Sequence, residues 1–225
     1  SETVAELTFA LMISVAHRIT EADAYARAGK YKGWGPMILL GTDLYGKTLG
    51  IIGLGRIGIA VAERAVKGFK MKVVYSDMRR NPEFEKTYNA QHLPMEKLLQ
   101  ESDFVSLHVP LFPSTRHLIS TAEFALMKKN AFLVNTARGP IVDEKALLRA
   151  LRTGRIAGAG LDVFECEPAI DCDLTDKLEL KKFSNVILTP HTASATVEAR
   201  QTMSTLAAEN IIAALEGKAP PNVAR

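Results

Sequence analysis

The sequence predicts an α/β fold in which a doubly wound, parallel sheet is covered by helices on both faces. Short apolar segments recur along the chain without period-two alternation, which is typical of strands buried on both faces. Segments of helical periodicity lie between them, as in βαβ units. The expected strands are residues 48–52, 71–75, 104–108, 132–135, 158–163 and 186–188. The expected helices between them are residues 59–67, 95–101, 122–127 and 144–153.

The ends of the chain are expected to be helical. A Thr3-Val4-Ala5-Glu6 capping box precedes an apolar segment, which predicts an N-terminal helix whose apolar surface needs a partner, such as a second copy in a dimer. A C-terminal crossover helix is expected over residues 196–216, ended by Gly217. Residues 1–225 are therefore assigned to one domain, with a helical and irregular lead-in (1–46), a core (about 47–192) and a C-terminal helix and tail (193–225).

The composition is that of a globular protein. The chain has 225 residues, of which 47% are hydrophobic and 24% charged, and its net charge of +3 is not gathered in runs. We therefore expect neither a nucleic-acid partner nor a membrane partner. The two cysteines, Cys166 and Cys172, match no metal or redox spacing, so they are expected to be ordinary thiols in a reducing cytoplasm.

A glycine-rich turn connects the first expected strand to a helix. Gly53, Gly55 and Gly58 form a Gly-x-Gly-x-x-Gly motif. The first glycine permits a tight turn, the second lets the backbone approach a pyrophosphate, and the third lets helix and strand pack closely. Because the N–H groups that open the helix face the phosphates, this order of strand, turn and helix predicts a Rossmann dinucleotide site.

An acidic residue follows the second expected strand. Asp77 lies where a carboxylate accepts hydrogen bonds from the adenosine ribose and repels a 2′-phosphate, which favours NAD over NADP. Arg79 and Arg80 leave NADP open, because a guanidinium within reach could hold a phosphate. A methyltransferase is a distant alternative, since its loops are also rich in glycine.

Polar residues follow several of the expected strands, and in such a sheet ligands bind beyond the carboxyl ends of the strands. Arg138 could bind both oxygens of a 2-keto acid through its planar guanidinium. His191 could donate a proton to the developing alkoxide, and the carboxylate of Glu167 would favour the charged imidazolium. Each residue alone has an ordinary structural interpretation, in a turn, in a loop or facing solvent. His108 could line the cofactor side.

Four blocks of sequence resemble the D-isomer-specific 2-hydroxyacid dehydrogenases over essentially the whole chain. They are Leu107-His108-Val109-Pro110-Leu111, Val134-Asn135-Thr136-Ala137-Arg138-Gly139, Gly160-Leu161-Asp162-Val163-Phe164-Glu165-Cys166-Glu167-Pro168 and Leu188-Thr189-Pro190-His191. The resemblance implies that Arg138 binds substrate, that His191 is the acid/base, and that Glu167, not Glu165, pairs with His191. It implies cofactor contacts at Gly53, Gly55, Arg56, Ile57, Gly58, Asp77, Val109, Pro110, Thr115, Thr136, Ala137, Arg138, Asp162, His191 and Ala193.

The sequence departs from the family in two ways. Thr192-Ala193-Ser194 stands where the family often has Ile-Gly-Gly or Ile-Gly-Ser, so the Ala193 methyl group could crowd the nicotinamide. The segment that builds most of the family's substrate domain normally precedes residue 1, and it carries a glycine-rich loop that grips the substrate carboxylate. The isolated chain is therefore expected to be weakly active or inactive.

The resemblance implies hydride transfer between NAD(H) and a small 2-keto or 2-hydroxy acid, and the wording of the motifs is nearest to glyoxylate and hydroxypyruvate reductases. No metal is expected. The alternative is a non-catalytic NAD(H)-binding interaction module of the same fold. A homodimer is expected, with the lone Trp34 as a packing or interface anchor.

Overall fold

The computed structural model describes residues 1–167 and 179–223. Pro168 and Cys172, which belong to the segments discussed above, and the last two residues of the tail lie outside these ranges. The strands are β1 (Thr48–Ile52), β2 (Lys72–Ser76), β3 (Gln91–His92), β4 (Phe104–Leu107), β5 (Phe132–Asn135), β6 (Gly158–Leu161) and β7 (Val186–Leu188). They form one parallel sheet in the order β3-β2-β1-β4-β5-β6-β7. The chain runs outward from β1 to β3 and then crosses back to β4, which confirms the doubly wound fold.

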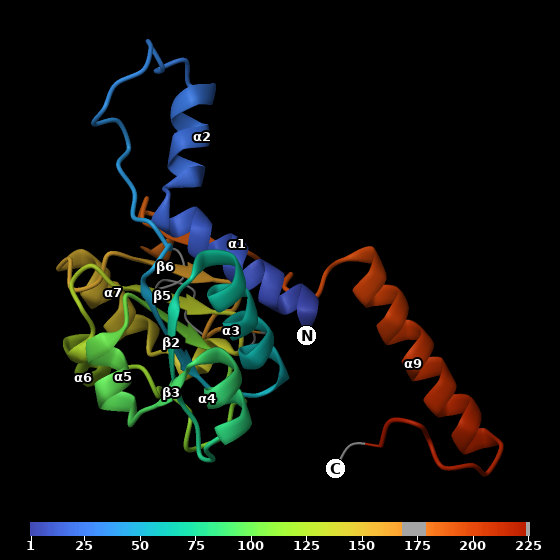
Figure 1. Ribbon diagram of the computed structural model, residues 1–225. Helices are drawn as coiled ribbons and strands as arrows, with labels where there is room; N and C mark the ends of the chain where they lie inside the picture. Colours follow the sequence, from blue (N-terminus) through green and yellow to red (C-terminus); the bar gives the residue numbers. More distant parts are fainter. Residues whose placement is uncertain (168–178, 224–225) are drawn as a thin grey trace.

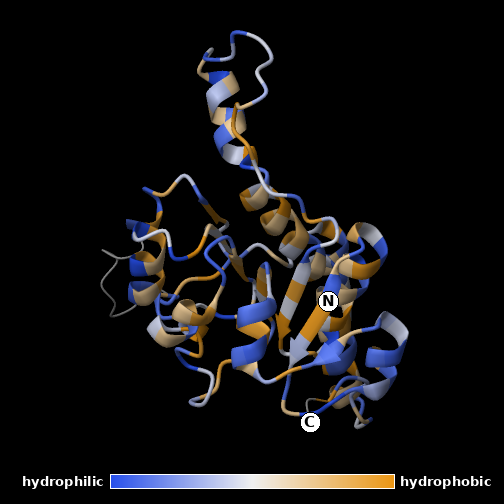
Figure 2. Cartoon of the chain, turned by 60° about the vertical axis from the view of Figure 1, so that its left-hand side comes forward, coloured by the Kyte–Doolittle hydropathy of each residue, from blue (hydrophilic) through white to orange (hydrophobic). Residues whose placement is uncertain are grey.

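Helices cover the sheet on both faces (Figure 1). They are α1 (Glu2–Ala16), α2 (Ile19–Arg27), α3 (Arg56–Phe69), α4 (Pro82–Tyr88), α5 (Met95–Glu101), α6 (Thr121–Leu126), α7 (Glu144–Arg152) and α9 (Val197–Leu215), with a 3₁₀ turn η1 (Gly139–Ile141). One hydrophobic core joins the sheet to α1, α3 and α4, and the other joins it to α5, α6 and α7. Hydrophobic colours accordingly follow the strands at the centre of the molecule (Figure 2).

The strands are buried on both faces, as their apolar composition predicts. All residues of β4, β5 and β6 are buried. A glycine in β6 lets α1 approach the sheet closely, since a Cβ atom on Gly160 would stand 2.9 Å from Cβ of Leu11. Helix α1 therefore already covers part of its own apolar surface by packing on the sheet and on α3.

Several expected boundaries are wrong by a few residues, and the N-terminal capping box is wrong. Helix α1 begins at Glu2, because the N–H of Ala5 bonds to the carbonyl of Ser1, so Thr3 lies inside the helix. The second strand begins at Lys72, because the N–H of Met71 is taken by the carbonyl of Ala65 at the end of α3.

Four elements were not expected from the sequence: α2, α4, the two-residue strand β3 and the 3₁₀ turn η1. Helix α4 had a readable start signal, because Asn81 accepts a hydrogen bond from the N–H of Phe84 and Pro82 is the first helical residue. No helix among the described residues has both the length and the apolar character needed to cross a bilayer.

Two segments stand clear of the sheet (Figure 1). The first, here called the arm, consists of α2 and the loop 28–43, and it carries exposed Tyr31, Trp34 and Met37. The second is α9, which is capped by Thr196 and has no buried residue. Its exposed apolar residues do not gather on one face; they are Val197, Met203, Leu206, Ile211, Ile212 and Leu215.

Candidate active site

The glycine turn has the geometry that the motif predicts. Gly53 has φ +95°, and a Cβ atom there would come within 2.8 Å of the carbonyl carbon of His108. A Cβ atom on Gly58 would collide with the carbonyl oxygen of Gly53, whereas nothing lies within 4 Å of one on Gly55. Gly53 and Gly58 are therefore required for packing, and Gly55 leaves open space beside the turn.

Helix α3 begins directly after this open space. Its N-cap is Gly55, no side chain caps it, and Arg56 and Ile57 are its first two residues. The first N–H groups of the helix and the positive end of its dipole are consequently available to an anion. These features fit the pyrophosphate of a dinucleotide.

Asp77 lies beside the glycine turn, at the carboxyl end of β2. Its Oδ2 accepts a hydrogen bond from the N–H of Leu54 at 2.7 Å, and Oδ1 accepts one from the N–H of Arg79 at 3.2 Å. Arg80 is paired with Glu85 at 2.6 Å, and this hydrogen bond is the main reason why the pKa of Glu85 is lowered to about 2. Arg80 is thus engaged elsewhere, and the carboxylate of Asp77 is held at the place expected for a ribose contact.

A pocket of about 430 Å³ opens next to the start of α3. It is lined by Ile57, His108, Val109, Pro110, Leu111, Thr136, Ala137 and Arg138. Thr115 lies in the loop beyond β4, where its hydroxyl donates to the carbonyl of Pro110 and so braces this wall. The pocket brings the ends of β4 and β5 together with the glycine helix, and its apolar walls fit a planar ring.

Asn135, at the end of β5, shapes the turn that carries Arg138. Its amide donates to the carbonyl of Arg138 at 2.9 Å, and its carbonyl accepts from the N–H of Ala137 at 3.0 Å. No role was expected for Asn135, although it lies in one of the motifs quoted above. Thr136 shares a buried hydrogen bond with Thr8 of α1, which ties this strand end to the helix.

Arg138 extends from this turn into the pocket. Its guanidinium donates to the carbonyl of Ala137 at 2.6 Å. Within the described residues it forms no ion pair. Its positive charge therefore remains available to an anionic ligand.

Asp162, at the end of β6, organises the turn that carries His191. Its side chain is fully buried, and its oxygens accept from the hydroxyl of Thr189 at 2.6 Å and from the N–H groups of Thr192 and Ala193 at 2.8 Å. Its own carbonyl accepts from the N–H of His191. These bonds hold His191 at φ +54°, a left-handed conformation that a non-glycine residue adopts only where its surroundings enforce it.

The imidazole of His191 and the carboxylate of Glu167 meet. Nδ1 of His191 is hydrogen-bonded to Oε1 of Glu167, and both side chains are partly exposed. The expectation that these two groups converge is confirmed, and the partner is Glu167, as expected, because Glu165 is engaged elsewhere. Among the described residues Nε2 of His191 has no hydrogen-bond partner, so this nitrogen is left for a ligand.

His108 differs from His191 in its surroundings. Burial lowers its pKa to about 4, and its Nε2 is hydrogen-bonded to the hydroxyl of Ser106 at 2.8 Å. A neutral imidazole cannot donate a proton as an acid at neutral pH. His108 therefore lines the pocket, and His191 is the imidazole suited to proton transfer.

The remaining expectations concern Ala193, the cysteines and metals. Ala193 is buried, so its methyl group packs within the protein. Cys166 is disulfide-bonded, so the expectation of an ordinary thiol is wrong for this residue, and the argument from thiols to a reducing compartment loses its basis. In residues 1–167 and 179–223, no group of three or more His, Cys, Asp or Glu side chains is arranged to hold a metal ion.

The fold and this edge of the sheet define a nucleotide-binding α/β domain in which a hydrogen-bonded histidine–glutamate pair and an unpaired guanidinium among the described residues lie near the glycine turn. The sequence profile of the family described as D-isomer specific 2-hydroxyacid dehydrogenase, NAD binding domain, matches residues 9–193. The chain belongs to this family, and NAD is its cofactor.

Individual relatives agree with this assignment. A protein from Korarchaeum cryptofilum named glyoxylate reductase is 54% identical over 224 residues, which are 99% of this chain and 66% of the relative. A crystal structure from Thermus thermophilus superposes with a TM-score of 0.90 at 46% identity, over 99% of this chain and 68% of that one. The crystal structure of D-lactate dehydrogenase with NAD⁺ from Lactobacillus jensenii superposes with a TM-score of 0.88 at 34% identity, over 100% of this chain and 69% of that one. This chain thus spans about two thirds of the length of its relatives.

Proposed function

We propose that this chain is the cofactor-binding domain of an enzyme that transfers hydride between NAD(H) and a small 2-keto or 2-hydroxy acid. The observation that carries the proposal is the hydrogen bond between Glu167 and His191 at the edge of the sheet that also carries Arg138 and the glycine turn. Glyoxylate is the leading substrate, because relatives of about 50% identity are named glyoxylate reductase. Hydroxypyruvate is the second, because the motifs resemble those of glyoxylate and hydroxypyruvate reductases.

The residues of the glycine turn would hold the cofactor. The N–H groups that open α3, at Arg56 and Ile57, would bind the pyrophosphate, and Asp77 would accept hydrogen bonds from the adenosine ribose. Bound NADH supplies the hydride. The wall formed by Val109 and Pro110 would line the adenosine side of the cofactor. Thr136, Asp162 and Ala193 would surround the nicotinamide, with Asp162 near its carboxamide.

The remaining chemistry belongs to the side chains of this chain. Arg138 would bind the substrate carboxylate and polarise its carbonyl with a charge that persists at any working pH. Nε2 of His191 would donate a proton to the oxygen that becomes an alkoxide. The carboxylate of Glu167, bonded to Nδ1, stabilises the positive charge of the imidazolium and fixes the ring so that Nε2 faces outward.

The substrate would also need residues beyond this chain. The chain spans 66% of a glyoxylate reductase, and α9 has apolar residues on several sides and none buried. Large apolar side chains that are exposed on several sides of one helix mark a surface that other parts of a protein cover. We therefore propose that residues 1–225 form the cofactor domain and that α9 returns to a substrate domain built by the remaining third. The isolated chain should bind NADH and turn over poorly, because the substrate would not be oriented.

The proposal is tested by mixing the longer protein that contains this chain with NADH and a panel of 2-keto acids. We expect loss of NADH absorbance with glyoxylate or hydroxypyruvate. Tight NADH binding without oxidation of NADH by any acid of the panel would contradict the proposed enzymatic function. That result would favour a non-catalytic NAD(H)-binding module.

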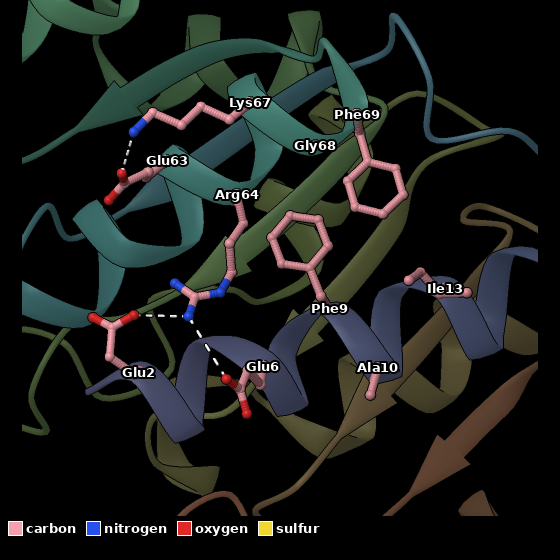
Figure 3. A pocket seen from close by; sticks show the side chains of 10 residues that line it. All are labelled: Glu2, Glu6, Phe9, Ala10, Ile13, Glu63, Arg64, Lys67, Gly68 and Phe69. Atoms are coloured by element: carbon pink, nitrogen blue, oxygen red, sulfur yellow. Dashed lines mark hydrogen bonds and ion pairs between the residues drawn. The ribbon is translucent and has the colours of Figure 1, made fainter.

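We further propose that the protein is a homodimer in which the arm of one copy packs against the second copy. Trp34 and Met37 on the arm are 84% and 75% exposed. Neighbouring large apolar side chains that are this exposed are typical of an interaction surface. Between α1 and α3 the body has an apolar groove of about 820 Å³, in which Phe9 and Phe69 stack and glutamates line the rim (Figure 3). The glutamates of the rim are already paired with Arg64 and Lys67, so the apolar floor of the groove is the surface that the arm would cover.

Trp34 is the only tryptophan of the chain, so its fluorescence reports directly on the arm. We expect a dimer by light scattering, a blue-shifted emission that moves to longer wavelength on dilution, and a monomer for Trp34→Lys. A monomer at every concentration would refute the dimer.

A cytoplasmic location is also proposed, because NADH is regenerated inside the cell; cell fractionation tests it.

A further inference from the structure

A second histidine–glutamate pair lies next to the first. Glu165 is two residues before Glu167 in the loop after β6, and its Oε1 accepts a hydrogen bond from Nε2 of His117 at 2.5 Å. The guanidinium of Arg116 lies 3.3 Å from the same oxygen. The other oxygen, Oε2, accepts from the N–H of Glu144 at the start of α7, at 3.3 Å. One carboxylate therefore joins the loop after β6 to the loop before α6 and to α7.

The backbone at Glu165 is held from the same side. Its N–H donates to Oε1 of Glu144 at 2.5 Å, and Glu144 is only 6% exposed. The 3₁₀ turn after β5 presses against the loop as well, since a Cβ atom on Gly139 would collide with the carbonyl of Phe164. We call this set of contacts, made by Arg116, His117, Gly139 and Glu144 to residues 164–165, the Glu165 clamp.

The clamp bears on the orientation of Glu167. The N–H of Phe164 donates to Oε2 of Glu167 at 3.4 Å, which leaves Oε1 for Nδ1 of His191. A shift of residues 164–165 would move the donor that orients the Glu167 carboxylate. Small displacements of this kind matter, because a misplacement of about 1 Å can lower a rate by about 100-fold.

We propose that Glu165 is a positioning residue: held by His117, Arg116 and Glu144, it fixes the loop that aims the carboxylate of Glu167 at His191. Its catalytic meaning rests on the proposed function, whereas the clamp itself is tested without turnover. The side chains of His117 and Arg116 are 38% and 55% exposed, and partly exposed pairs of this kind contribute about 1 kcal/mol or less to stability. Loss of the Glu165 charge should therefore leave the fold intact.

The first test is NMR of the ¹⁵N-labelled 225-residue chain at slightly acidic pH. The proton on Nδ1 of His191, hydrogen-bonded to a carboxylate, should give a downfield resonance that is assigned by its absence in His191→Asn. We expect Glu165→Gln and His117→Asn to broaden or shift this resonance. The control is Glu101→Gln, because Glu101 is exposed at the end of α5, on the opposite edge of the sheet. This variant should leave the resonance unchanged.

A resonance of unchanged position and intensity in both Glu165→Gln and His117→Asn would overturn the clamp. In the longer protein Glu165→Gln should lower kcat about tenfold while the Kd of NADH stays constant, a split that a general loss of structure would not produce. The two proposals can fail separately. If the longer protein reduces no keto acid, the proposed function is refuted. Loss of the His191 resonance in Glu165→Gln and His117→Asn would still support the clamp.

Discussion

Nδ1 of His191 is hydrogen-bonded to Oε1 of Glu167, although the two residues are 24 positions apart in the sequence. The contact forms because β6 and β7 are neighbours in the sheet and because the Asp162 carboxylate accepts hydrogen bonds from the backbone of the turn after β7. A buried carboxylate thus fixes the backbone of the histidine, and a partly exposed one fixes its ring. Positions at the ends of parallel strands are where such groups are expected to meet.

The charge of Glu167 should matter for turnover and little for cofactor binding. Glu167→Gln keeps the size of the side chain but no longer stabilises the imidazolium, so we expect kcat in the longer protein to fall by about 100-fold. Steady-state oxidation of NADH with glyoxylate measures this, and fluorescence titration measures the Kd of NADH. A kcat equal to that of the wild type would remove Glu167 from the mechanism.

Gly58 should tolerate no side chain. In Gly58→Ala the new Cβ atom would meet the carbonyl oxygen of Gly53, which is backbone and cannot move aside, so we expect a loss of about 1–3 kcal/mol in the free energy of unfolding. Gly68→Ala is a matched control on the same helix, because nothing lies within 4 Å of its Cβ atom. Alanine there should stabilise the helix by up to about 1 kcal/mol. Urea denaturation compares the two variants, and equal stabilities would show that Gly58 has another purpose.

The carboxylate of Asp77 should set the preference for NADH over NADPH. Asp77→Asn retains an acceptor for the N–H of Leu54 but no longer repels a 2′-phosphate. We expect the Kd of NADH to rise about tenfold and the Kd of NADPH to fall, measured by fluorescence titration of the 225-residue chain. An unchanged ratio of the two constants would place the ribose contact elsewhere.

His108 should make the protein less stable in mild acid. Its pKa is lowered from 6.5 to about 4 by burial, so between these values the unfolded chain binds a proton that the folded chain does not. The contribution of His108 is therefore complete above pH 6.5 and is lost as the pH falls toward 4, by at most about 3 kcal/mol.

His108→Asn isolates this contribution from those of the carboxylates. The free energy of unfolding of the variant, followed by urea denaturation from pH 7 to 4, should fall less steeply with acid than that of the wild type. The same slope in both proteins would show that the imidazole titrates normally in the folded state.

The sheet could be predicted because its signals are local, and the pair of Glu167 and His191 could be predicted because the family resemblance implies it. Strands such as 48–52 and 132–135 are short and mostly apolar. The rule that ligands bind beyond strand ends places residues 167 and 191 in the same region. The glycine turn could be predicted because each glycine has a distinct steric reason to be there.

What could not be predicted depends on contacts between distant segments. The bond between His117 and Glu165 spans 48 positions and has no periodic or motif signal. The two-residue strand β3 is too short for a pattern, and it forms because Val74 and Tyr75 of β2 offer it an edge. The projection of the arm is likewise a matter of tertiary placement, since the sequence indicated only an irregular segment with Trp34 as a packing or interface anchor.

The most direct test of the account follows the hydride itself. The longer protein, mixed with NADH that carries deuterium at the transferred position, should convert glyoxylate to glycolate labelled at carbon 2, and His191→Asn should abolish the labelling while binding NADH normally. The central claim is that His191, supported by Glu167, donates the proton that accompanies hydride transfer from NADH. Labelled product formed equally well by His191→Asn would contradict this claim. Unreacted glyoxylate recovered beside tightly bound NADH in the wild type would contradict it as well.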